Sequence, residues 1–160
     1  MTTLTIATPE EMESLGARIA AELRAGDLVA LNGELGAGKT TLTRGLGAAL
    51  GVRGTVTSPT FVLARTHPRV DGGAPLVHVD AYRLSSAAEL DDLDIDYAAS
   101  VVVVEWAAGM LDGLTEDWLE VNIARPMGAG VDGPDDADDA EPREVTITPH
   151  GARWADFLLR

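Results

Sequence analysis

The chain has 160 residues, no cysteine and a formal net charge of −14. Disulfides and thiolate chemistry are therefore excluded, and the three histidines are too scattered for a zinc site. No apolar run approaches the roughly 20 residues of a membrane-spanning helix, and no signal-peptide pattern is present. We expect one cytoplasmic domain over residues 1–160, with no membrane association. Its negative charge argues against tight binding of free nucleic acid.

The first predicted elements are a helix, a strand and a second helix. Thr8–Glu11 forms a capping box with proline at the first helical position, and helical spacing of apolar residues continues until Gly26 ends the helix. Leu28–Leu31 is a short apolar run that predicts a buried strand. Thr40–Leu50 predicts the second helix, with Gly51 as its C-terminal cap.

The rest of the chain alternates short strands with turns and loops. A capping box at Ser86–Glu89 predicts a short helix through Leu93, and Ala152–Leu159 is a candidate closing helix. Six acidic residues in Asp132–Glu141 predict a disordered surface loop over about residues 126–142. A turn is expected at His67–Ala74. Strands are predicted at Phe61–Arg65, Leu76–Asp80 and Val101–Val104, and edge strands at Leu119–Ile123 and Val145–Thr148.

Between the first strand and the second helix lies a phosphate-binding motif. Gly33–Thr40 matches the pattern G-x-x-x-x-G-K-[ST], in which glycines let backbone N–H groups converge on phosphate oxygens. Lys39 would supply a positive charge to the β and γ phosphates, and the Thr40 hydroxyl would ligate Mg²⁺. This context predicts an α/β fold of the P-loop NTPase type, a three-layer sandwich with a central, mostly parallel sheet and antiparallel edge strands. The expected nucleotide-binding residues are Gly33, Glu34, Leu35, Gly36, Ala37, Gly38, Lys39, Thr40 and Thr41.

Phosphoryl chemistry also needs a carboxylate near Mg²⁺, and two acids follow apolar runs. Asp80 ends Leu76–Asp80, and Glu105 follows Val101–Val104. In a parallel sheet both would emerge at the edge where the phosphate-binding loop lies. One could hold the metal shell while the other orients the attacking water, and the residues alone do not assign these roles. Lys39, Asp80 and Glu105 are the candidate catalytic residues.

Four segments in register resemble the TsaE family. They are Gly33–Thr41, Ser58–Phe61, His78–Leu84 and Glu105-Trp106, and the resemblance spans roughly Thr8 to Glu120. TsaE proteins are the bacterial ATPases of tRNA threonylcarbamoyladenosine biosynthesis. The resemblance therefore implies a P-loop ATPase that binds ATP and Mg²⁺.

The resemblance also implies roles for individual residues. Thr40 and Glu105 would bind Mg²⁺, and Asp80 would serve hydrolysis. Thr60 lies in Ser58–Phe61, which resembles a switch loop that senses the γ-phosphate. Thr8 and Arg143 resemble positions that flank the adenine. TsaB and TsaD are the implied protein partners, and hydrolysis should be slow without them.

Other functions are weighed against this one. A GTPase would need an Asn-Lys-x-Asp segment, which is absent. A small-molecule kinase stays open, because the loop does not say whether water or a substrate hydroxyl attacks. A nucleotide-gated interaction protein with incidental turnover is the other alternative. The segment Lys39–Arg83 carries a local charge of +4, either by ordinary fluctuation of surface charge or because it faces phosphates or an acidic partner.

Overall fold

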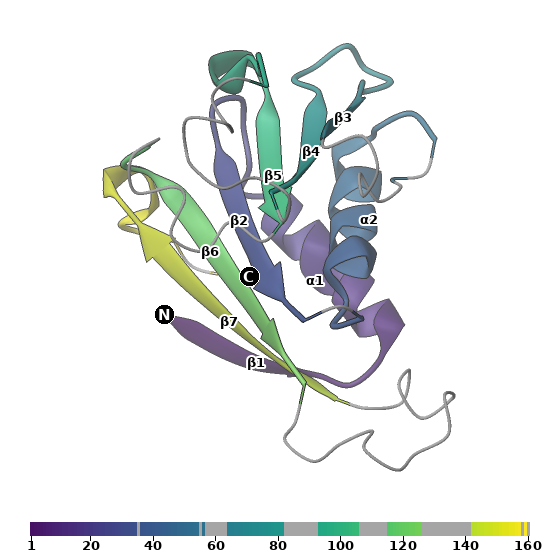
Figure 1. The fold of residues 1–160 in the computed structure, drawn as a ribbon, viewed down its shortest axis with the longest axis vertical. Helices are drawn as coiled ribbons and strands as arrows, with labels where there is room; N and C mark the ends of the chain where they lie inside the picture. The colour runs from purple at the N-terminus through teal and green to yellow at the C-terminus, as the bar shows by residue number, and fades with distance from the viewer. Residues whose placement is uncertain are drawn as a thin grey trace.

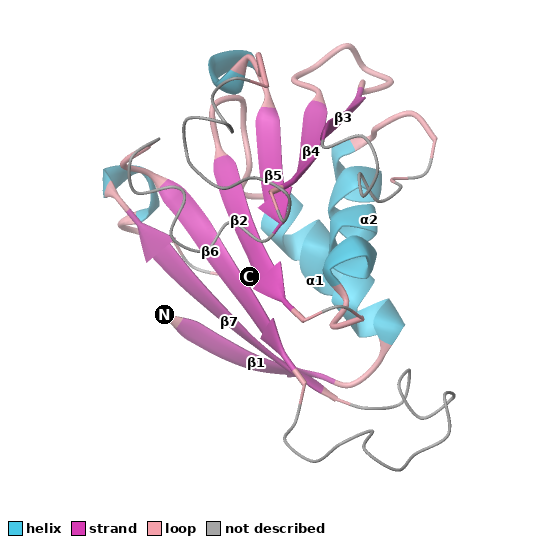
Figure 2. Cartoon of the chain, in the orientation of Figure 1, coloured by secondary structure: helices cyan, strands magenta, loops and turns pink. Residues whose placement is uncertain are grey.

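The fold is built on one seven-stranded sheet in the order β1-β7-β6-β2-β5-β4-β3 (Figure 1). The computed structural model describes residues 1–34, 36–54, 56, 64–81, 93–105, 115–125, 142–157 and 159. Two α-helices, two 3₁₀ turns and the seven strands make up the described elements (Figure 2). The strands are β1 (Thr2–Ile6), β2 (Leu28–Gly33), β3 (Ala64–His67), β4 (Leu76–Asp80), β5 (Val101–Glu105), β6 (Trp118–Ala124) and β7 (Arg143–His150).

The sheet has a parallel centre and antiparallel margins. β6, β2, β5 and β4 run parallel to one another, whereas β7 pairs antiparallel with β6 and with β1, and β3 pairs antiparallel with β4. The predicted fold class is confirmed. The prediction that Leu119–Ile123 and Val145–Thr148 form edge strands is wrong, since β6 and β7 lie inside the sheet and the edges are β1 and β3.

The two α-helices, α1 (Pro9–Ala20) and α2 (Lys39–Leu50), pack side by side on one face of the sheet (Figure 1). Their backbones touch at two glycines. A Cβ atom on Gly16 would collide with the carbonyl oxygen of Leu42, and one on Gly45 with the carbonyl oxygen of Glu13. This contact fixes α1 against the helix that follows the phosphate-binding loop. The main core fills the space between both helices and the sheet.

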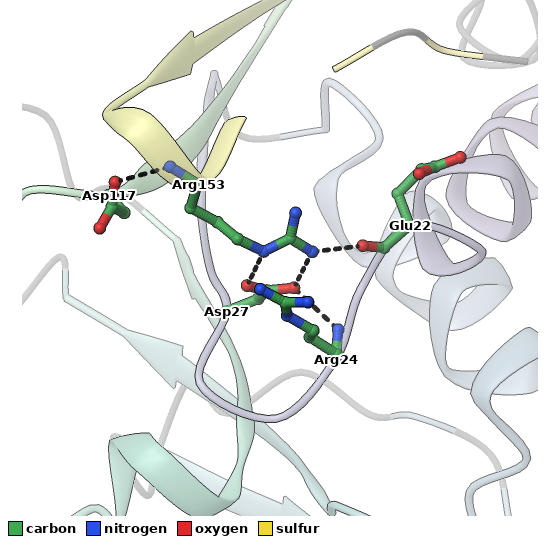
Figure 3. A network of polar contacts seen from close by, with 5 residues as sticks. All are labelled: Glu22, Arg24, Asp27, Asp117 and Arg153. Carbon is green, nitrogen blue, oxygen red and sulfur yellow. Dashed lines mark hydrogen bonds and ion pairs between the residues drawn. The ribbon is translucent and has the colours of Figure 1, made fainter. Parts of the chain in front are cut away.

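A polar network fastens the C-terminal region to the turn between α1 and β2 (Figure 3). The guanidinium of Arg153 donates to both carboxylate oxygens of the buried Asp27 at 2.9 Å and to the backbone carbonyl of Glu22 at 2.9 Å. The backbone N–H of Arg153 donates to Asp117, and Asp27 also accepts from the backbone N–H of Arg24 at 2.8 Å. These bonds occupy backbone groups just beyond α1. They explain why the helix ends at Ala20 rather than continuing to Gly26 as predicted.

Two other expectations need correction, and one strand was not anticipated. The alternating sequence of β1 was not predicted as a strand, and His67 continues strand β3 instead of opening a turn. The predicted closing helix Ala152–Leu159 is a single 3₁₀ turn, η3 (Ala152–Trp154), in its described part. Another 3₁₀ turn, η1 (Tyr97–Ala99), precedes β5. Residues 86–92 of the predicted short helix, and the acidic segment 126–141, lie outside the described residues. None of the described helices is long and apolar enough to cross a membrane.

Candidate functional site

The phosphate-binding motif forms a tight loop between β2 and α2. Gly33 is the last residue of β2, and α2 begins at Lys39. Gly36 and Gly38 have φ angles of +81° and +118°, in the left-handed region that favours glycine. Gly38 also packs on the side chain of Met12, so that a Cβ atom there would lie 3.2 Å from the methionine methyl carbon. Both glycines therefore serve the turn that aims the loop at the start of α2.

Lys39 folds back on this loop. Its Nζ donates to the carbonyl oxygens of Gly33 at 2.7 Å and Glu34 at 2.9 Å. The side chain is buried, and burial lowers the pKa of Lys39 below its ordinary value of 10.5, while the negative charges of Glu105, Asp80 and Glu34 oppose that lowering. Lys39 is thus close enough to both candidate carboxylates for their charges to interact. This is the arrangement expected of a charge that meets phosphates beside a metal site.

Arg143 also holds the backbone of this loop. It begins β7 and is buried, and its Nε donates to the carbonyl oxygen of Ala37 at 3.1 Å. A terminal nitrogen of the same guanidinium donates to the carbonyl oxygen of Gly36 at 3.4 Å. Two successive carbonyls are therefore held by one rigid fork. The N–H of Ala37, which lies between these two carbonyls, donates to the carbonyl oxygen of Glu34 at 3.0 Å, so this part of the loop is fixed by hydrogen bonds of both kinds.

Asp80 and Glu105 meet at the carboxyl ends of neighbouring strands. They are directly opposite one another in the parallel register of β4 and β5. Leu76 and Val103 face the core beneath α1 and α2, so alternation along each strand places both acids on that same face. Both are buried, at 6% and 4% exposure. Two carboxylates at this depth need a positive partner, since burial of an unpaired charge is costly.

The side chains present fit a magnesium–nucleotide complex. In the described part of the chain, no three His, Asp or Glu side chains gather into an all-protein metal site. Mg²⁺ is usually held differently, through one or two carboxylates together with phosphate oxygens and waters. Asp80 and Glu105 offer those carboxylates, and Thr40 lies in the first turn of α2 beside Lys39.

The other predicted contacts are spread around this centre. Thr41 is half-buried in the first turn of α2, and Glu34 is exposed on the loop. Thr8 is the N-cap of α1, where its hydroxyl accepts from the N–H of Glu11 at 3.1 Å. Leu35 and Thr60, with the rest of Ser58–Phe61, lie outside the described residues.

Sequence reasoning missed two contributors to this site, Met12 and His78, and it did not anticipate the contact that Arg143 makes. Met12 on α1 packs against Gly38, and Arg143, which was expected beside the adenine, donates to loop carbonyls. His78, two residues before Asp80 on β4, points to the same face of the sheet and approaches Glu105. Strand alternation alone could have revealed His78. The other two depend on long-range packing.

Comparisons with known proteins agree with this geometry. Residues 6–129 match the family model of "Threonylcarbamoyl adenosine biosynthesis protein TsaE". A Streptomyces coelicolor protein named tRNA threonylcarbamoyladenosine biosynthesis protein TsaE is 60% identical over 147 residues, covering 90% of this chain and 94% of that one. Proteins of the same name from Mycobacterium tuberculosis and Bacillus subtilis are 48% and 37% identical, covering 77% and 91% of this chain and 79% and 84% of theirs.

A solved structure gives the same result for the fold. The crystal structure of Bacillus subtilis YdiB superposes with a TM-score of 0.69 at 32% sequence identity, covering 96% of this chain and 88% of that one. The family model covers the loop, both carboxylates and the strands that carry them. With this motif order, this sheet and these relatives, the chain belongs to the TsaE family.

Proposed function

We propose that this protein binds ATP with Mg²⁺ and hydrolyses it as the ATPase of tRNA threonylcarbamoyladenosine biosynthesis, working with TsaB and TsaD. The observation that carries the proposal is the meeting of Lys39 with Asp80 and Glu105 at the end of the phosphate-binding loop. The relatives that match this chain in sequence are named for this pathway, which supports the choice of pathway.

Each residue has a task in this proposal. The loop N–H groups and the N-terminus of α2 bind phosphate oxygens, and Lys39 neutralises charge on the β and γ phosphates. To do so, the Lys39 ammonium exchanges its bonds to Gly33 and Glu34, at least in part, for phosphate. Bound Mg²⁺ would neutralise charge that develops on the phosphates. Thr40 and Glu105 would hold the ion, and Asp80 would orient the attacking water.

The partners are proposed from family membership and from charge. The segment Lys39–Arg83 carries +4 in a chain of −14. Within it Arg44, Arg53 and Arg65 are exposed, whereas Arg83 lies outside the described residues. This surface would meet an acidic partner, or the nucleic acid that a partner binds. The negative charge of the rest of the chain would disfavour tight binding of free tRNA.

The test is phosphate release from ATP by the purified chain, with and without TsaB and TsaD. We expect slow release from the chain alone and faster release with the partners, because an arginine supplied in trans is worth roughly 10³–10⁵ in rate. Lys39→Ala should abolish release in both conditions. Transfer of the phosphate to an added small molecule would favour a kinase. Unchanged binding and turnover in Lys39→Ala would overturn the proposal.

A further inference from the structure

His78 is a fully buried polar residue in the middle of β4, with Arg65 as its register partner on β3. Its side chain has 0% exposure, and it lies on β4 between Leu76 and Asp80 on the face that meets α2. Its register partner on β5 is Val103, which is also fully buried. An aliphatic residue would fill this position without the cost of burying an imidazole. The histidine therefore calls for an explanation beyond packing.

The imidazole of His78 lies close to Glu105, which is a candidate metal ligand. Nε2 of His78 lies 3.0 Å from Oε2 of Glu105, although Glu105 belongs to the next strand and is two positions further along the register. The Glu105 side chain is thus turned back toward His78. The distance is that of an ion pair, but the ring nitrogens make no aligned hydrogen bond. A buried imidazole in this state is close to its acceptor and still unsatisfied.

Lys39 makes the position of Glu105 important. Its ammonium interacts electrostatically with Glu105, as it does with Asp80 and Glu34. If the Glu105 carboxylate formed a direct ion pair with Lys39, it would neutralise the positive charge that the phosphates need. A donor on the opposite side can hold one carboxylate oxygen and leave the other to face a metal ion. Nε2–H of His78 can donate whether the ring is neutral or charged.

We propose that His78 is a positioning residue that holds Oε2 of Glu105, so that this carboxylate is oriented for the metal ion of the nucleotide complex. The inference rests on the proposed function. Replacing a side chain that hydrogen-bonds to a metal ligand commonly lowers metal affinity by about 10–100-fold. His78 supplies this support from the neighbouring strand, and it acts through Glu105 without touching the nucleotide.

The test measures metal affinity separately from nucleotide affinity. Binding of Mn²⁺, a paramagnetic substitute for Mg²⁺, is followed by electron paramagnetic resonance in the full chain saturated with ADP. Binding of ADP is measured in EDTA by calorimetry. The variants are His78→Leu, which removes the donor, His78→Asn, whose shorter amide falls short of Glu105, and His78→Gln, whose amide can replace Nε2–H. The matched control is His67→Leu, another buried histidine on the neighbouring strand β3.

We expect Mn²⁺ affinity to fall about tenfold in His78→Leu and His78→Asn, and to stay close to the parental value in His78→Gln and His67→Leu. ADP affinity in EDTA should stay unchanged in all four. Parental Mn²⁺ affinity in His78→Asn would overturn the inference, as would an equal loss of ADP affinity in EDTA. If His78→Leu does not fold, the comparison of His78→Asn with His78→Gln decides. A parent chain that binds no ADP would instead overturn the proposed function.

Discussion

Asp80 and Glu105 are register partners in the parallel pair of β4 and β5, and both are buried. Twenty-five positions separate them in the sequence, and the sheet makes them neighbours. Both interact with the positive charge of Lys39. This relationship divides the proposed chemistry between two acids that share one cation, and it makes their roles separable by mutation.

Glu105→Gln should shift the Mg²⁺ dependence of ATP hydrolysis to concentrations higher by at least about tenfold, because it removes a charged ligand of the ion. Asp80→Asn should instead lower the maximal rate by roughly 10²–10⁴ at saturating Mg²⁺, because it removes the group that orients the water. Steady-state rates across a magnesium titration separate the two. Glu144→Gln on the exposed side of β7 is the control. If both site variants turned over at the parental rate, other acids would carry these roles.

Arg143→Lys should weaken binding of ATP and of inorganic triphosphate alike. The fork that holds Gly36 and Ala37 is lost while the charge is kept, and one charge-assisted hydrogen bond is worth about 1.5–3 kcal/mol. We expect affinity for both ligands to fall about tenfold, measured by calorimetry. Arg53→Lys, at an exposed arginine, should change neither. Loss of ATP affinity with triphosphate affinity intact would show instead that Arg143 acts on the adenine.

Arg153→Ala should destabilise the fold by about 3 kcal/mol, because it leaves the carboxylate of Asp27 buried without its cation (Figure 3). Arg69→Ala removes the ion pair with Asp71, whose side chain is 62% exposed, and should cost much less because solvent screens that pair. Urea denaturation gives both free energies of unfolding. Equal losses in the two variants would mean that burial does not govern these pairs.

His67 should make the fold less stable in acid. Burial, followed by the charges of His78 and Arg65, lowers the pKa of His67 below its ordinary value of 6.5. The folded chain therefore binds fewer protons at this site than the unfolded chain does, and stability is lost as pH falls below 6.5 toward the lowered value. The loss of unfolding free energy between pH 7.5 and pH 5.5 should be smaller in His67→Leu than in the parent. Equal losses would contradict the buried, neutral state of His67.

The sequence by itself determined the local parts of this protein. Phosphate-loop glycines, a lysine at the start of α2 and the cap at Thr8 depend on residues a few positions apart, and the structure places the described ones as predicted. The order of motifs was enough to identify the family. Strand runs were also predicted correctly where burial on both faces makes the whole segment apolar, as in Val101–Val104.

Only the tertiary structure decided which distant residues meet. The interior positions of β6 and β7, the pairing of β1 and the early end of α1 depend on contacts with segments far away in the chain. The same holds for the approach of His78 to Glu105 and for the hydrogen bond from Arg143 to the phosphate-binding loop. Local sequence patterns indicate which residues favour burial and which residues cap a helix. Strand order and register are set by the summed free energy of long-range packing, which no short window of sequence contains.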